Sequence, residues 1–180
     1  MEGVERYQVR LLPHNTVWDS EFMRVQEMLK TCWKDNILDI QHVGSTAIPS
    51  ICAKPILDVA VRIKSLDILD KDALIQKGYD DCGLQNGKAT HRLFVLRGSQ
   101  QISLQHIHCY DQIDDEFDQL VGFRDYLNTH IEVALAYQEL KLSLAKQYPY
   151  NRQAYTQQKA PFILMVYQQL SQNSSSNGKR

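Results

Sequence analysis

Apolar residues recur with a helical period near the start of the chain and with the period of strands after it. One apolar stripe covers roughly four helical turns, and its members are Trp18, Phe22, Val25, Leu29 and Cys32. Residues 37–43 alternate as in a short strand, and residues 56–63 are almost entirely apolar, as in a strand covered on both faces. The pattern predicts a helix that packs on a sheet through its apolar stripe.

The middle of the chain predicts one further helix and a hairpin. Residues 65–77 carry apolar side chains at helical spacing, and Gly78 follows them as a C-terminal cap. Residues 79–89 are rich in turn formers. Residues 91–97 and 102–109 have the composition of strands and are joined by a short polar loop, so we expect them to pair as a hairpin.

The two ends of the chain differ in the structure they predict. Residues 7–12 alternate weakly, which indicates an edge strand, and Asn15 is placed to cap the helix that follows. The last third is helical, with apolar residues at helical spacing in 117–127 and 131–148 and a final helix that begins at Pro161.

One domain accounts for nearly the whole length. With 180 residues and 43% hydrophobic content, the chain buries one substantial core. We expect a single domain over residues 1–170 and a disordered tail over residues 171–180, which bury too little apolar surface to fold. The expected fold class is α/β (α+β), with a mixed β-sheet core flanked by helices and a helical C-terminal third.

The charge balance excludes a polyanion or a membrane as the default partner. The chain has 20 Lys and Arg against 21 Asp and Glu, a net charge of −1. No apolar run is long enough to cross a bilayer, and the N-terminus lacks the features of a secretory signal, so we expect a cytoplasmic protein. The four cysteines lack metal-site spacing and are expected to be buried free thiols: Cys32, Cys52, Cys82 and Cys109.

A small-residue turn and a lone carboxylate form the first candidate site. Gly44, Ser45 and Thr46 follow a predicted strand, and backbone N–H groups at such a turn suit a phosphate. Pro49 limits any helix there to a short one. Asp58 lies on an otherwise apolar strand, where a carboxylate is costly to bury unless it is paired or bound to metal. The alternative is an Asp at the strand end, in solvent or bonded to backbone N–H groups.

Two histidines form the second candidate site. His106 and His108 share one face of a predicted strand because side chains alternate with a period of two. Such a pair can present two ligands to one metal ion, or a general base and its neighbour. The alternative is a pair of half-buried histidines bonded to backbone carbonyls. His42 or Asp58, on neighbouring strands, would supply a third ligand.

Several motifs, in this order, resemble the GrpB family. They are HVGSTAIPSICAKPILDVAV, QHIHCY, FRDYLNTH, YQELK and AYTQQKAPFI, and the similarity runs from about Val9 to Leu170. The family belongs to the nucleotidyltransferase-like superfamily. The resemblance implies a mixed α/β core in which a Gly-Ser turn after one core strand faces carboxylates on the next.

Active members of that superfamily bind a triphosphate at Gly-Ser and two divalent metals at paired acids. The resemblance assigns these roles to Gly44, Ser45 and Asp58, whereas Ala60 stands where the second acid is expected. His106 and His108 fall near the expected position of the third acid. The resemblance therefore implies a metal site at Asp58, His106 and His108, for Mg²⁺ or Mn²⁺ with Zn²⁺ as an option.

The basic members of the remaining family-like residues suit a nucleotide or a phosphorylated small molecule. The family-like residues are His42, Lys54, Arg92, Arg124, Asp125, Tyr137, Lys141, Tyr155 and Lys159, and with Thr46 of the turn all but Asp125 and Tyr137 are predicted to bind this ligand. Some relatives are fused to dephospho-CoA kinase, an association with nucleotide or coenzyme A metabolism. Three functions stay open: transfer of a nucleotidyl or phosphoryl group, non-catalytic binding of a nucleotide or phosphometabolite, and hydrolysis at a His/Asp metal site. No spacing in the sequence fixes the substrate, the metal or the oligomeric state.

Overall fold

A single five-stranded mixed sheet forms the centre of the computed structural model, which describes residues 2–5 and 7–177. The strands are β1 (Ile37–Val43), β2 (Leu57–Ile63), β3 (Tyr79–Leu84), β4 (His91–Arg97) and β5 (Ser103–Asp111). Their order across the sheet is β1-β2-β5-β4-β3; β2 and β5 run parallel, and the other neighbours are antiparallel. The mixed sheet with flanking helices confirms the expected fold class.

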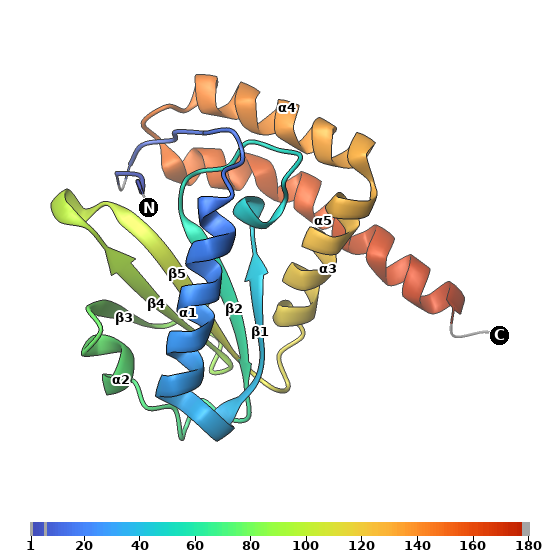
Figure 1. The fold of residues 1–180 in the computed structure, drawn as a ribbon. Helices are drawn as coiled ribbons and strands as arrows, with labels where there is room; N and C mark the ends of the chain where they lie inside the picture. Colours follow the sequence, from blue (N-terminus) through green and yellow to red (C-terminus); the bar gives the residue numbers. More distant parts are fainter. Residues whose placement is uncertain (1, 6, 178–180) are drawn as a thin grey trace.

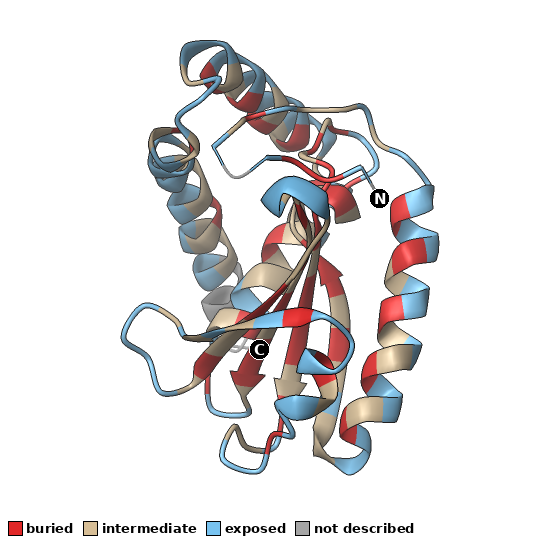
Figure 2. Ribbon diagram, turned by 90° about the vertical axis from the view of Figure 1, so that its left-hand side faces the viewer, coloured by how far each residue is buried: buried red, intermediate tan, exposed pale blue. Residues whose placement is uncertain are grey.

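The helices cover both faces of this sheet. They are α1 (Val17–Trp33), α2 (Asp72–Ile75), α3 (Glu116–Thr129), α4 (Ile131–Gln147) and α5 (Arg152–Asn177), with short 3₁₀ turns η1 (Lys34–Asn36), η2 (Ser45–Ala47) and η3 (Ser99–Gln101). Helix α1 lies along one face, whereas α3, α4 and α5 form a layer on the other side (Figures 1 and 2). The alternation of β2 follows this division: Val59 and Val61 face α1, and Asp58 and Ala60 face the three C-terminal helices.

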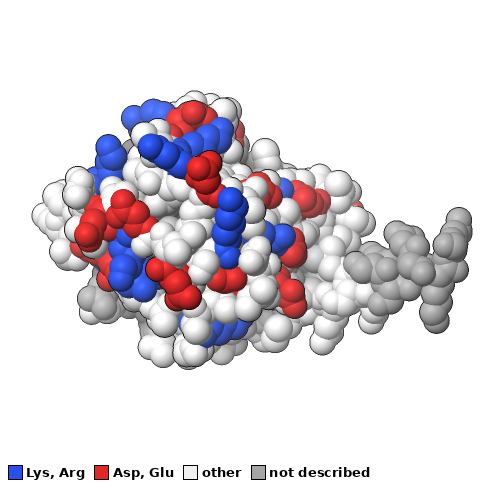
Figure 3. All heavy atoms as spheres, turned by 90° about the horizontal axis from the view of Figure 1, so that it is seen from below, with Lys and Arg blue, Asp and Glu red and all other residues white. Residues whose placement is uncertain are grey.

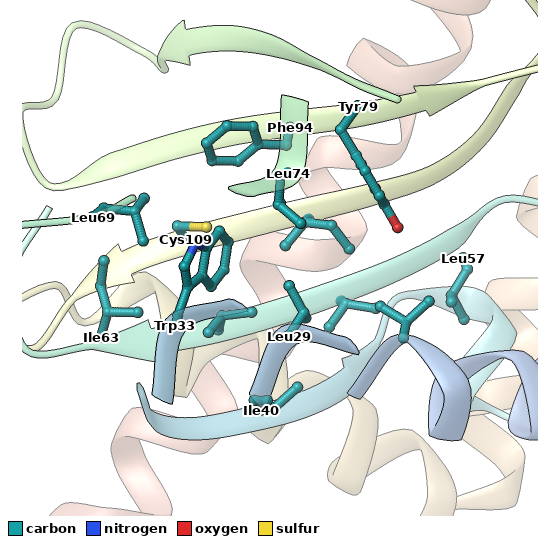
Figure 4. Close-up of a cluster of buried hydrophobic side chains, with 14 residues drawn as sticks. Leu29, Trp33, Ile40, Leu57, Ile63, Leu69, Leu74, Tyr79, Phe94 and Cys109 are labelled. Carbon is teal, nitrogen blue, oxygen red and sulfur yellow. The ribbon is translucent and has the colours of Figure 1, made fainter. Parts of the chain in front are cut away.

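The main core fills the space between α1 and the sheet (Figure 4). Leu29 is completely buried, and Trp33 packs near Phe94 with ring centroids 6.0 Å apart. The indole N–H of Trp33 also donates a hydrogen bond to the carbonyl of Asp70 over 2.8 Å, so the buried ring leaves no polar group unpaired. This core holds the strands in register and thereby fixes the side chains on their opposite face.

A second core joins the C-terminal helices to the loop between β1 and β2. Ile48 and Ile51 of that loop pack with Leu127 of α3, Tyr137 of α4 and Val166 of α5. All five are nearly inaccessible to solvent. The turn at the end of β1 is therefore fixed from both sides, by its own strand and by the helical layer.

Two short predicted elements differ from the structure because side chains compete with the backbone for hydrogen bonds. Residues 65–77 form only one helical turn, α2, because the Ser65 hydroxyl and the Asp70 carboxylate accept backbone N–H groups and make turns instead. Residues 79–84, expected to be turns, form strand β3, which is anchored by the buried Tyr79 and by ion pairs to β4.

The two ends of the chain also differ from the expectation. Residues 7–12 make an isolated bridge, Leu12 to Ala53, rather than a strand. Helix α5 does not begin at Pro161 but runs through it, since Tyr155 and Val166 on either side are both buried. It continues to Asn177, so residues 171–177 of the expected disordered tail are helical, and residues 178–180 lie outside the described part.

The surface charges agree with the near balance of positive and negative residues in the sequence. Positive and negative side chains are interspersed on the face shown in Figure 3. Within residues 2–5 and 7–177, no helix is long and apolar enough to cross a membrane.

Replacing Leu29 with Ala tests the role of the main core. The substitution leaves a cavity under the sheet and should lower the free energy of unfolding by about 2–5 kcal/mol. Urea denaturation measures this loss. Met23→Ala is the matched control on the same helix, because Met23 is 55% exposed and its removal should cost roughly 0.5 kcal/mol or less. Equal losses for the two variants would contradict the packing described above.

Candidate functional site

The turn after β1 is held directly against Asp58. Gly44 has a φ of 72°, and a Cβ added to it would lie 2.6 Å from Asp58 Oδ2. Both constraints require glycine at this position. The antiparallel register pairs Val43 with Asp58, which places the turn beside the carboxylate.

His42 positions this turn from the other face of the sheet. Its Nε2 lies 2.9 Å from the Thr46 hydroxyl, and its ring stacks on Phe22 of α1 with centroids 5.2 Å apart. Burial lowers the pKa of His42 to about 4, so the imidazole is neutral at physiological pH. His42 was expected to contact a phosphate, but it does not line the pocket that the turn borders.

Asp58, His106 and His108 converge across the parallel pair β2 and β5. The register sets Asp58 opposite His106 and Ala60 opposite His108. Asp58 Oδ1 lies 2.9 Å from His106 Nδ1 and 4.0 Å from His108 Nε2. One donor atom from each residue falls within 4.8 Å of the others, so the three form a potential metal-binding group.

The protonation of this group suits a cation. Burial opposes the ionisation of Asp58, but His106, His108 and Lys54 outweigh it and lower its pKa to about 2. Burial lowers the pKa of His108 to about 4. A metal ion needs an ionised carboxylate and neutral imidazoles, and Asp58 and His108 are already in these forms at neutral pH.

A chain of polar groups fixes the orientation of His108. His91 Nε2 lies 3.1 Å from His108 Nδ1, and His91 Nδ1 lies 3.7 Å from a carboxylate oxygen of Glu116. His91 is only 4% exposed and stacks on Tyr110. A metal ion bound at His108 Nε2 would require the His108 proton to be on Nδ1. That N–H then donates a hydrogen bond to His91 Nε2, and the His91 proton is on Nδ1, on the side of Glu116.

A pocket of about 200 Å³ opens beside Asp58, and four cationic side chains line it. Lys54 precedes β2, Lys141 comes from α4, and Arg152 and Lys159 lie one above the other on α5. Among the described residues that line the pocket, Asp58 is the only carboxylate, and Asp58 already makes a hydrogen bond with His106.

Burial makes these cations poorly solvated. It lowers the pKa of Lys54 and of Lys141 to about 7 and that of Lys159 to about 8, and the neighbouring cations act in the same direction. The pKa of Arg152 is lowered as well. An anion in the pocket would relieve both the desolvation and the mutual repulsion.

Aromatic rings lie against the cations. The ammonium groups of Lys54 and Lys159 are 5.4 and 4.9 Å from the ring centroid of Tyr155. Lys141 lies 4.9 Å from the ring of Tyr137 and donates a hydrogen bond to the Cys52 carbonyl. The remaining wall is apolar or aromatic and consists of Ile56, Leu120, Phe123, Ile163 and Tyr167. The lining of the pocket is thus partly cationic and partly apolar.

The structure separates the predicted site residues into two groups. Those that line the pocket are Gly44, Ser45, Thr46, Lys54, Asp58, His106, Lys141, Tyr155 and Lys159. His108 does not line the pocket but lies close to Asp58 and His106. Three predicted binding residues, His42, Arg92 and Arg124, lie elsewhere.

The two outlying arginines make structural contacts. Arg92 forms a bidentate ion pair with Asp81 of β3, at the far edge of the sheet. Arg124 donates hydrogen bonds from α3 to the His42 carbonyl and the Gln41 amide oxygen of β1. Arg152 lines the pocket but was not among the predicted binding residues; its helical spacing with Tyr155 and Lys159 is the signal that points to it.

Comparison with known proteins decides the family. The family model for GrpB protein matches residues 8–169. The chain belongs to the GrpB family. It is 33% identical to Glutamate-rich protein GrpB of Alkalihalophilus pseudofirmus, over 91% of this chain and 96% of that protein. It is also 33% identical to UPF0157 protein YqkA of Bacillus subtilis, where the match covers 86% of this chain but only 45% of the relative.

Solved structures extend the comparison to the fold. The crystal structure of the conserved protein GrpB from Enterococcus faecalis aligns with a TM-score of 0.81 at 27% identity, covering 89% of this chain and 96% of that one. Cid1 in complex with the UTP analogue UMPNPP aligns with a TM-score of 0.52 at 13% identity, over 82% of this chain and 48% of Cid1. The GrpB chain therefore has a nucleotidyltransferase-like fold.

The position where the sequence resemblance places a second acid is closed in this GrpB protein. Ala60 is completely buried against Val43, Tyr110 and Phe117, so no ligand reaches the site from there. His108 stands directly across from Ala60 on β5. The polar groups beside Asp58 thus come from β5 as imidazoles rather than from β2 as a second carboxylate.

The pH dependence of sulfate binding tests whether the lysines of the pocket have lowered pKa values. Its charge is constant between about pH 6 and about pH 9, so changes in its affinity report the protein. Because the lowered pKa values lie at about 7 to 8, the lysines lose charge over this range and sulfate should bind less tightly as pH rises. Without sulfate, the stability of the folded protein should change with pH in the opposite direction. The lysines bind more protons in the unfolded state than in the folded state, so the free energy of unfolding should increase as pH rises from about 7 to about 10.

Thermal melting of the protein with and without sulfate at each pH measures both effects. Lys146→Gln, at the exposed end of α4, should leave the profile unchanged, whereas Lys159→Gln should flatten it. A sulfate effect that is independent of pH, or equal in the two variants, would contradict the shifted lysines.

Proposed function

We propose that this GrpB protein binds a nucleotide or another phosphorylated small molecule in the pocket beside Asp58, with a divalent metal ion at Asp58, His106 and His108. The observation that carries the proposal is the convergence of four cations on a pocket that has one carboxylate in its lining. Such a pocket lacks balancing negative charge, and phosphate groups would supply it. The apolar wall next to the cations suits the less polar part of the same ligand.

The donor set favours a borderline metal. Two imidazoles and one carboxylate are a combination that suits Zn²⁺ or Mn²⁺ better than Mg²⁺, which prefers oxygen ligands. The metal would supply Lewis-acid polarisation of a phosphoryl oxygen. The chain itself would contribute the ionised Asp58, the turn at Gly44 and Ser45 that borders the phosphates, and Lys54, Arg152 and Lys159 that neutralise their charge.

Transfer of a nucleotidyl or phosphoryl group is the reaction that this arrangement suits best. A non-catalytic binding module is the alternative, and the burial of Ala60 favours it, because a conventional two-metal site needs a second acid there. Release of product in the presence of metal separates the two functions.

A thermal-shift screen tests the proposal. The ligands are nucleoside triphosphates, coenzyme A precursors and sugar phosphates, each with and without Mg²⁺, Mn²⁺ or Zn²⁺. A ligand at one hundred times its Kd should add about 2.7 kcal/mol, a rise of several degrees for a domain of this size.

Three variants assign that rise to the pocket. Lys159→Gln should remove most of it, Asp58→Asn should remove the metal-dependent part, and Lys146→Gln should keep it. No shift with any of these ligands in the unmodified protein would overturn the proposal.

His91→Phe tests the orientation of His108. Phenylalanine keeps the stacking on Tyr110 but cannot accept the His108 proton, so the affinity for Mn²⁺ or Zn²⁺ should fall by roughly 10–100-fold. Calorimetric titration with the metal alone measures this. The matched control is His130→Phe, whose ring stacks on Tyr126 away from the site and whose metal affinity should be unchanged.

A further inference from the structure

The pocket beside Asp58, lined by Lys54, Lys141, Arg152 and Lys159, is called the anion pocket below. An open groove of about 580 Å³ lies next to it, on the same face of the sheet. We call it the side groove. Its floor is formed by side chains of β4 and β5, and its wall by the first two turns of α5; the residues that the argument uses are Leu93, Val95, Ser103, Gln153, Thr156 and Gln157.

The side groove and the anion pocket meet at two shared residues. His106 and Arg152 line both cavities. His106 is the residue whose Nδ1 lies 2.9 Å from Asp58, so the potential metal site stands at the boundary between the two cavities. A molecule in the side groove and one in the anion pocket would therefore both border His106 and Arg152, the second of which would neutralise phosphate charge.

The lining of the side groove differs in character from that of the anion pocket. Its polar groups are mainly neutral amides and hydroxyls, from Ser103, Gln153, Thr156 and Gln157. Arg97 is neutralised by Asp80 over 2.8 Å and donates to the Ser103 hydroxyl.

This lining also indicates the class of ligand. Amides and hydroxyls both donate and accept hydrogen bonds, and the floor at Leu93 and Val95 is apolar. Such a surface matches a ligand with many hydroxyls around a carbon framework better than it matches a second polyanion.

We propose that the side groove binds the acceptor of the transferred group, a small neutral molecule rich in hydroxyls, such as a sugar or a nucleoside. This inference rests on the proposed function, because the donor would occupy the anion pocket. In the transfer, an acceptor oxygen forms a bond to the donor phosphorus and the bond from phosphorus to the leaving phosphate oxygen breaks. The electron pair leaves with that phosphate, and the acceptor proton passes to water in the open groove.

Cys82 provides a direct readout of the side groove. It lines the groove and is exposed, contrary to the expectation of buried thiols. Cys32, by contrast, packs against the core on the other face of the sheet. The rate of Cys82 alkylation by iodoacetamide, relative to Cys32 and followed by mass spectrometry, therefore measures occupancy of the groove.

The experiment uses the full chain with Mn²⁺ and pyrophosphate. Glucose, ribose, myo-inositol and adenosine are added one at a time. We expect at least one of them to slow the alkylation of Cys82 about threefold or more, as mass action requires at twice its Kd. Thr156→Trp, which fills the groove from an exposed position, should abolish this protection, and Gln158→Trp on the outer side of α5 should retain it.

Two outcomes would overturn the inference, and they are distinguishable from failure of the proposed function. If pyrophosphate raises the melting temperature but no hydroxyl compound protects Cys82, the anion site stands and the acceptor site does not. If a hydroxyl compound protects Cys82 equally in both tryptophan variants, it binds outside the side groove. Absence of any pyrophosphate effect on melting would instead remove the donor site and, with it, the acceptor role.

Discussion

The Asp58 carboxylate is the group on which the site depends. It lies on the edge of the pocket, beside Gly44, with imidazoles from β5 and partly buried cations around it. A partly buried carboxylate is costly unless it is paired or hydrogen-bonded, and here several elements supply partners. The turn after β1, strand β5 and the loop before β2 are therefore tied to one another through a single charge.

The sheet makes this arrangement possible by separating two kinds of face. The α1 face of β2 and β5 is a closed and mainly apolar core, whereas the opposite face carries Asp58, His106 and His108 in adjacent register positions. Because α3, α4 and α5 cover that second face only in part, a pocket remains where polar groups meet both protein and solvent. The rigid core thus determines the geometry of the polar groups behind it.

Local patterns in the sequence were sufficient for most strands and long helices. The alternation in residues 37–43 and the apolar run before Ile63 gave β1 and β2, since both depend on neighbours close in sequence. The proximity of Asp58, His106 and His108 could also be predicted, because each is a polar residue on a predicted strand.

The rest required tertiary contacts that no local pattern carries. Strand β3 depends on cross-strand ion pairs of Asp80 and Asp81, and α5 continues through Pro161 because residues on both sides of it pack in the helical layer. The same limit applied to the cations: only the folded chain distinguishes Arg92, which is paired with Asp81, from Arg152, which faces the pocket.

The four cations have a consequence for the lifetime of the protein. Without an anion, partly buried positive charges repel one another and the folded state is less stable than its core would allow. If the proposed anionic ligand binds in the pocket, it removes that repulsion, and the fraction of unfolded chains exposed to proteases falls when this ligand is plentiful. The amount of the protein in a cell would then follow the supply of the proposed ligand, without any change in the rate of synthesis.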